Sequence, residues 1–278
     1  MIITFKRFGR LGNRLFLFSH LIAFAEWSNV SVFMPAFSEF IGSFPFFKNP
    51  LCEYIPKGKD TNVSNSPSAL GLRAAGLIRA IPTVRFWDER DIVFDGEDAT
   101  DSRVRTMIES PRVVFEGWRF RSHETILGIM PRIRTVFAPK ENILHHAEAL
   151  LEHARGMGDI VIGVHLRWED YRGTPYFFPL NVFLNRMKEI ASFFKPMKVS
   201  FVICSPEKLK QEDFPDTCVF SSDGSPVQDM YSLAGCDYIL GPPSTFSGWA
   251  SFYGSKPLFT MRKDIPFDNV SEADIVRW

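Results

Sequence analysis

The stretch that decides the fold class spans residues 159–173 and reads DIVIGVHLRWEDYRG. Its first part, from Asp159 to Leu166, is an apolar run typical of a strand buried in a parallel sheet. His165 and Arg167 stand where this strand would end, and parallel sheets bind ligands at the carboxyl ends of their strands. A guanidinium can hold a phosphate through two parallel hydrogen bonds. The alternative is a strand end held by a salt bridge.

From this stretch onward, short apolar runs alternate with helical segments, which predicts a parallel sheet covered on both faces. The predicted strands are 159–166, 198–204, 217–221, 238–241 and 256–260, and the predicted helices are 181–194, 225–236 and 244–253. Upstream, strands are predicted at 2–5, 30–34, 84–87 and 111–116, with a Ser/Asn/Pro-rich loop from Thr61 to Ser68. We therefore expect an α/β protein with two Rossmann-type domains, 1–156 and 157–278.

Two further stretches carry candidate site residues. The strand at 238–241 is followed by two prolines and by Ser244, Thr245, Phe246 and Ser247, which begin a predicted helix. A helix N-terminus attracts anions, although capping alone would also explain its hydroxyls. Near the N-terminus, a strand precedes a glycine loop, Gly9 to Arg14, and a helix from Leu15 to Trp27.

Together, the three stretches resemble the α-1,2-fucosyltransferase family of the bacterial type. The His-x-Arg-x-x-Asp motif also relates the chain to protein O-fucosyltransferases and α-1,6-fucosyltransferases. The matching positions are Gly12 and Asn13; His165, Arg167, Asp170 and Tyr171; Asp229; and Ser244, Thr245, Phe246, Ser247 and Trp249.

The resemblance implies a GT-B-like fold, with an N-terminal acceptor-side domain and a C-terminal nucleotide-sugar domain facing a cleft. It implies inverting, metal-independent transfer of fucose from GDP-fucose to a hydroxyl of an oligosaccharide or glycoconjugate, with an α-1,2 linkage and no cofactor. Arg167 would stabilise the β-phosphate and Asn13 would reach the sugar or the incoming hydroxyl. The expected substrate-binding residues are Gly12, His165, Asp170, Tyr171, Ser205, Asp229, Ser244, Thr245 and Phe246. Glu39 and Glu116 are candidates for a general base.

The chain departs from the family pattern at several positions. Trp168 replaces the second arginine of the middle motif, and Arg14 replaces a glutamine. Cys204 and Ser205 stand where related enzymes have an aspartate that holds the guanine edge. Base recognition should therefore rest on weaker, neutral partners, and GDP should still bind better than UDP or ADP.

Composition excludes several other classes. The net charge is zero and the pI about 7.0, so neither nucleic-acid binding nor a polybasic membrane surface is expected. The four cysteines lack paired spacing, and a metal at His145, His146 and His153 is not expected. The crowded phenylalanines from Phe37 to Phe47 favour packing over an acceptor cleft.

The chain's apolar runs are too short to span a bilayer. Residues 6–25 resemble a signal peptide, but cleavage there would discard Gly12 and Asn13, so a cytoplasmic location is expected. Peripheral membrane association would follow only from a lipid-linked acceptor.

Two other classes of function stay open. Gly9 and Gly12 form half of a dinucleotide fingerprint, which would suit a nucleotide-dependent oxidoreductase or epimerase. Leu15 stands where a third glycine belongs, and no acidic residue closes the strand at 30–34. The aromatic content would also suit a glycan-binding module without catalysis. Turnover of a donor, or uptake of a nicotinamide cofactor, would separate these alternatives.

Overall fold

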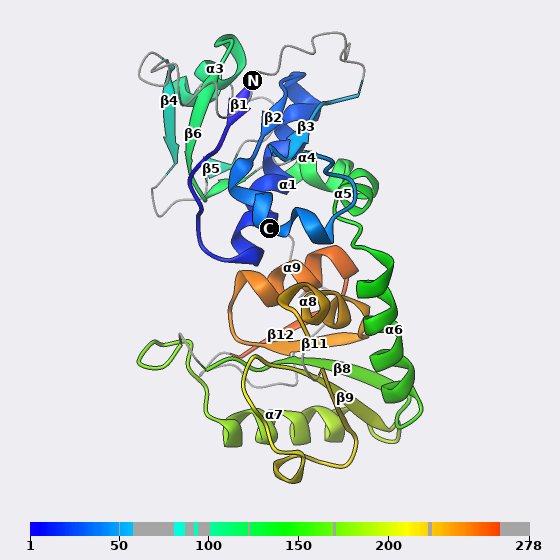
Figure 1. Ribbon diagram of the computed structural model, residues 1–278. Helices are drawn as coiled ribbons and strands as arrows, with labels where there is room; N and C mark the ends of the chain where they lie inside the picture. Colours follow the sequence, from blue (N-terminus) through cyan, green and yellow to red (C-terminus); the bar gives the residue numbers. More distant parts are fainter. Residues whose placement is uncertain are drawn as a thin grey trace. The chain divides into compact units, whose positions relative to one another are not determined.

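The computed structural model describes residues 1–49, 51–57, 81–86, 92–93, 101–121, 123–168, 171–221 and 224–261 (Figure 1). The chain forms two compact units, Met1–Ala138 and Pro139–Trp278. The α/β class is confirmed, because each unit contains its own largely or wholly parallel sheet. The predicted loop from Thr61 to Ser68 lies outside the described residues.

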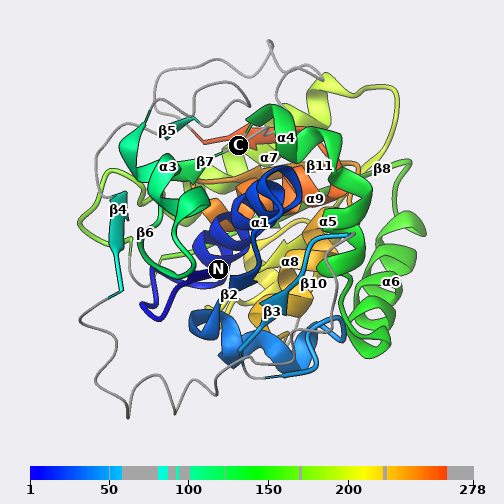
Figure 2. The same ribbon diagram turned by 90° about the horizontal axis from the view of Figure 1, so that it is seen from above.

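The second unit begins before the division that we placed after residue 156. Helix α6 (Glu141–Arg155) belongs to this unit and packs against α8 (Pro226–Gly235), beside which it lies in both views (Figures 1 and 2). Its buried residues, which include Ile143, Ala147 and Leu151, recur at helical spacing and form the stripe that faces the unit.

The sheet of the second unit has five parallel strands in the order β10-β9-β8-β11-β12. Their bounds are β8 (Ile160–His165), β9 (Val199–Cys204), β10 (Cys218–Phe220), β11 (Tyr238–Gly241) and β12 (Leu258–Thr260). This is a Rossmann-type order, in which the chain moves outward from β8 on one side and then returns to build the other side. The predicted strands are confirmed, with ends differing by no more than two residues.

The two faces of this sheet are covered by different helices. Helix α7 (Leu180–Phe193) packs on one face, against Ile162 and Val164 of β8. Helices α8 and α9 (Thr245–Gly254) lie on the other side (Figure 1). Because side chains alternate along a strand, Gly163 and His165 face α8 and α9. A Cβ at Gly163 would lie 2.8 Å from Leu233 Cδ2, so this glycine lets α8 pack closely.

The sheet of the first unit has the order β3-β2-β1-β6-β4 and is parallel except for β3. Its strands are β1 (Ile2–Ile3), β2 (Val32–Phe33), β3 (Glu53–Tyr54), β4 (Thr83–Phe86) and β6 (Val113–Gly117), and β5 (Ile92–Val93) pairs with β7 (Phe120–Arg121). Its helices are α1 (Leu11–Ser28), the 3-10 helix η1 (Pro35–Ser43), α3 (Ser102–Glu109), α4 (His123–Gly128) and α5 (Met130–Val136).

Helix α1 begins earlier than the sequence predicted. We expected a loop through Arg14, but the helix starts at Leu11, so Gly12 and Asn13 lie in its first turn. Gly12 is therefore a helical residue and does not mark the end of a loop.

The phenylalanine-rich stretch packs the first unit, as we expected. Phe37 and Phe44 are fully buried, and both rings contact Phe137 with centroids 5.9 Å apart. Phe18 of α1 stacks on Phe47 at 5.0 Å. The aromatic content of this stretch therefore serves the core.

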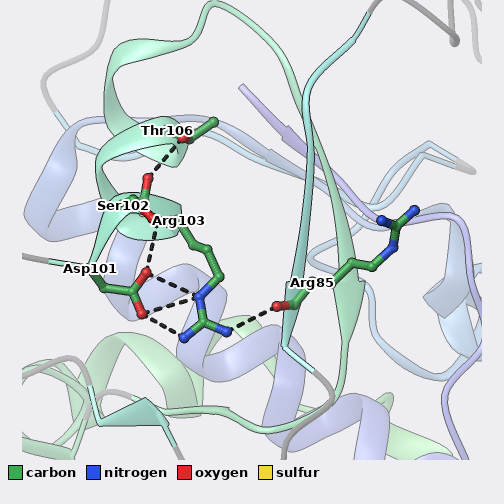
Figure 3. A network of polar contacts seen from close by, with 5 residues as sticks. All are labelled: Arg85, Asp101, Ser102, Arg103 and Thr106. Atoms are coloured by element: carbon green, nitrogen blue, oxygen red, sulfur yellow. Dashed lines mark hydrogen bonds and ion pairs between the residues drawn. The ribbon is translucent and has the colours of Figure 1, made fainter.

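A polar network fixes helix α3 to strand β4 (Figure 3). Asp101 caps α3 by accepting a hydrogen bond from the Arg103 amide at 2.8 Å, and it also pairs with the Arg103 guanidinium at 2.6 Å. Arg103 Nη1 donates to the Arg85 carbonyl oxygen at 3.2 Å. The guanidinium of Arg103 lowers the pKa of Asp101.

Candidate active site

The end of β8 and the start of α9 meet at the point where the strand order of the second unit reverses. His165 is 3 % exposed, and its Nδ1 lies 2.8 Å from Ser247 Oγ. Its ring stacks on Phe246, with centroids 4.6 Å apart and planes at 29°. The structure thus brings together two motifs that are 82 residues apart in sequence. Such reversal points are where open α/β sheets bind their ligands.

Gly241 makes this contact sterically feasible. A Cβ at this position would lie 2.6 Å from Ser247 Oγ and 3.2 Å from His165 Cβ. Ser247 Oγ also donates toward the Pro242 carbonyl oxygen, at 3.5 Å. Gly241 therefore has a packing role. Ser247, which we had matched to the motif without assigning a role, is the partner of His165.

Ser244 serves as the N-cap of α9. Its hydroxyl oxygen accepts hydrogen bonds from the amides of Phe246 and Ser247, at 3.2 and 3.3 Å. This is the capping geometry that was the alternative explanation of the hydroxyls here. Thr245, the first helical residue, is half-buried. Contacts of Ser244 and Thr245 with a substrate stay predictions.

Arg167 and Tyr171 lie side by side just beyond β8, and both are half-buried. The Arg167 guanidinium carbon is 5.1 Å from the centre of the Tyr171 ring, within the range of a cation–π contact. Between them, Trp168 donates from Nε1 to the Phe178 carbonyl oxygen at 2.9 Å and packs against the core beneath α7. The tryptophan that replaces an arginine is thus an anchor for this loop. Asp170 lies outside the described residues, and its role stays a prediction.

A cavity of about 490 Å³ opens at the carboxyl ends of β9 and β10. Its lining includes Ser205, Glu207, Phe220, Ser221 and Gly224. The Ser205 hydroxyl accepts a hydrogen bond from the Glu207 amide at 3.1 Å.

Of the two residues that replace the family's aspartate, only Ser205 lines this cavity. The neighbouring Cys204 thiol is buried and approaches the Asp229 carbonyl oxygen at 3.6 Å. Burial raises the pKa of this thiol.

Asp229 is buried behind the cavity, in the first turns of α8. Ser221 Oγ donates to Asp229 Oδ1 at 2.5 Å, and His146 Nε2 lies 3.2 Å from the same Ser221 oxygen. Burial raises the pKa of Asp229 to about 7, and the hydrogen bond from Ser221 opposes this shift. His146 of α6 is half-buried beside this serine. This contact could not be predicted from the sequence, because α6 is far from Ser221 along the chain.

In the first unit, Asn13 folds over Gly9. Gly9 has a φ of +60°, and a Cβ there would lie 1.9 Å from Asn13 Nδ2. Gly12 is buried within the first turn of α1. The structure therefore explains Gly9 by local packing, and a substrate-binding role of Gly12 stays a prediction. The predicted contact of Asn13 with the sugar or acceptor stays a prediction.

Both candidate bases are held by arginines. Glu39 pairs with Arg14 at 2.5 Å and with Arg7 at 3.2 Å. Glu116 pairs with Arg85 at 3.0 Å.

In the part of the chain that the structure describes, no group of three or more His, Cys, Asp or Glu side chains is arranged to hold a metal ion. In the same part of the chain, no helix has the length and apolar character needed to cross a membrane.

Several solved structures share the architecture of the chain. One is fucosyltransferase NodZ from Bradyrhizobium, which is 17% identical, with a TM-score of 0.55 over 95% of this chain and 97% of that one. Another is POFUT1 in complex with GDP-fucose, at 13% identity and a TM-score of 0.57, covering 91% and 93% of the two chains. A mutant of Arabidopsis thaliana FUT1 in complex with GDP is 12% identical, with a TM-score of 0.56, and the match covers 99% of this chain and 73% of that chain.

The chain has the fold of these fucosyltransferases. No protein-family model matches it, and no curated protein matches it either. At identities this low, the structural similarity shows a shared fold and does not show a shared activity. The activity must be argued from the site.

Proposed function

We propose that the chain is an inverting fucosyltransferase that uses GDP-fucose as donor and a glycan hydroxyl as acceptor, without a metal ion. The observation that carries this proposal is the contact of His165 with Ser247 and Phe246 at the strand-order reversal. It places Arg167 and the N-terminus of α9 at the carboxyl edge of one sheet. A guanidinium and a helix N-terminus both favour a diphosphate.

The chemistry requires stabilisation of the leaving group. As the sugar–phosphate bond breaks, negative charge grows on the β-phosphate, and fixed positive groups that face it lower the barrier. In this proposal Arg167 binds the β-phosphate, the first turn of α9 binds its remaining oxygens, and His165 contacts the nucleotide. The cavity at β9 and β10 then receives the base, with Ser205 in its wall and Asp229 behind it.

GDP-fucose is supported as the donor because structures with the same fold were solved in complex with GDP or GDP-fucose. The α-1,2 linkage, the acceptor-side role of the first unit and the participation of Asn13 rest on the sequence motifs. A cytoplasmic location belongs to the same proposal.

The test is a calorimetric titration with GDP, UDP and ADP, followed by an assay of fucose release or transfer from GDP-fucose. We expect GDP to bind most tightly and the donor to turn over. Equal affinities, or a preference for UDP, would overturn the choice of donor. Tight GDP binding without turnover on any glycan would favour a binding module. Uptake of a nicotinamide cofactor would favour an oxidoreductase or epimerase.

A further inference from the structure

Ser221 occupies the centre of a hydrogen-bond chain at the wall of the cavity. The residue follows β10 and is 7 % exposed, and it contacts Asp229 from α8 and His146 from α6. Three elements of the same unit therefore fix one hydroxyl. Ser221 is also one of the residues that line the cavity.

The number of hydrogens decides what the hydroxyl can offer. A serine hydroxyl has one hydrogen and two acceptor lone pairs. When Asp229 is ionised, Ser221 donates its hydrogen to Asp229 Oδ1, so the contact with His146 requires Nε2 to donate. In this state the hydroxyl has no hydrogen left to donate, and its remaining lone pair can accept a hydrogen bond from a ligand in the cavity.

Gly224 keeps the hydroxyl in this orientation. A Cβ at Gly224 would lie 2.5 Å from Ser221 Oγ and 2.5 Å from Asp229 Oδ1, so its backbone covers the pair closely. Gly224 is also part of the cavity wall. The hydroxyl is thus confined between the carboxylate, the imidazole and this backbone.

We propose that Ser221 determines base specificity by accepting a hydrogen bond from the exocyclic 2-amino group of guanine. This inference rests on the proposed function, which brings a guanine nucleotide to the carboxyl edge of this sheet. It explains how a chain that lacks the family's aspartate after β9 would still select guanine. The acceptor is a neutral hydroxyl on the neighbouring strand, held by a buried carboxylate.

The experiment compares GDP with inosine diphosphate, which has the same base without the 2-amino group. Both are titrated by calorimetry into the wild-type protein and into Ser221→Ala at about pH 8, where Asp229 is ionised. We expect the wild type to prefer GDP, and the variant to bind GDP about 5- to 10-fold more weakly, as for one neutral hydrogen bond. Its affinity for inosine diphosphate should not change, so the preference disappears.

Ser232→Ala is the matched control. It removes another buried hydroxyl of the same unit, which donates to the Gln228 carbonyl oxygen at 2.9 Å and does not line the cavity. This variant should keep the wild-type preference for GDP. A purely structural role of Ser221 would lower both affinities equally and would overturn the inference, as would an unchanged preference in Ser221→Ala.

A second variant serves if Ser221→Ala does not fold. In Ser221→Cys, a thiol of similar size replaces the hydroxyl and is a much weaker acceptor, so most of the preference for GDP should again disappear. Its retention would contradict the inference. A wild-type protein that binds GDP no better than UDP or ADP would refute the proposed function itself, and this inference with it. Intact GDP selectivity with no effect of either variant refutes the role of Ser221 alone.

Discussion

Replacing Asp229 with asparagine should change how the stability of the protein depends on pH. Burial raises the pKa of this carboxyl from 3.8 to about 7, so between these values the folded state holds a proton that the unfolded state releases. Stability therefore falls as pH rises through this window, because ionising the buried group is costly. At about 1.4 kcal/mol per pKa unit, the full penalty is at most about 4 kcal/mol. Asparagine carries no charge and avoids it.

The assay is urea denaturation of the wild type and of Asp229→Asn at steps between pH 4 and pH 8. The variant should gain stability relative to the wild type as pH rises to about 7, and the difference should then level off. The same pair is measured in a His146→Gln background, which removes the imidazole that contacts Ser221. A difference between wild type and variant that does not depend on pH would refute the reasoning.

Three other perturbations test the site and its support. Arg167→Lys should lower donor turnover by about 100-fold or more, because an ammonium lacks the fork geometry for a phosphate, with little change in the melting temperature; unchanged turnover would reject the assignment. Gly241→Ala should cost about 1–3 kcal/mol in urea denaturation, because the added methyl group meets Ser247 and His165, and normal stability would contradict the close packing. Activity should survive a chelator of divalent ions, since the chain contains no Asp-x-Asp triplet; loss of activity that magnesium or manganese restores would disprove metal independence.

The strands of the second unit could be predicted because each is a short apolar run with a turn signal at its end. The starts of α8 and α9 could also be predicted from the sequence, because prolines and serines mark them. The start of α1 was wrong, because two glycines suggested a loop. Gly9 does take a left-handed turn, whereas Gly12 is helical. Local sequence does not separate these two uses of glycine.

The candidate site was predictable where its residues follow strands and not where they meet across elements. The meeting of His165 with the start of α9 followed from the rule that parallel strands share a carboxyl edge. The contact of His146 with Ser221 could not be predicted in this way, because it depends on how α6 packs beside α8 and β10. The capping role of Ser244 was one of two explanations, and only the hydrogen-bond geometry identified it.

The crowding around Gly241 also bears on how this site can evolve. The backbone of this residue, the Ser247 hydroxyl and the His165 side chain occupy adjoining space, so a mutation at one position alters what the other two tolerate. A larger residue at any one of these three positions should destabilise the protein, because it meets the other two. A paired change, such as a larger residue at 241 with a smaller one at 247, should restore the fit. Descendants of this sequence should therefore change these positions together, and epistasis between them should outlast divergence elsewhere in the chain.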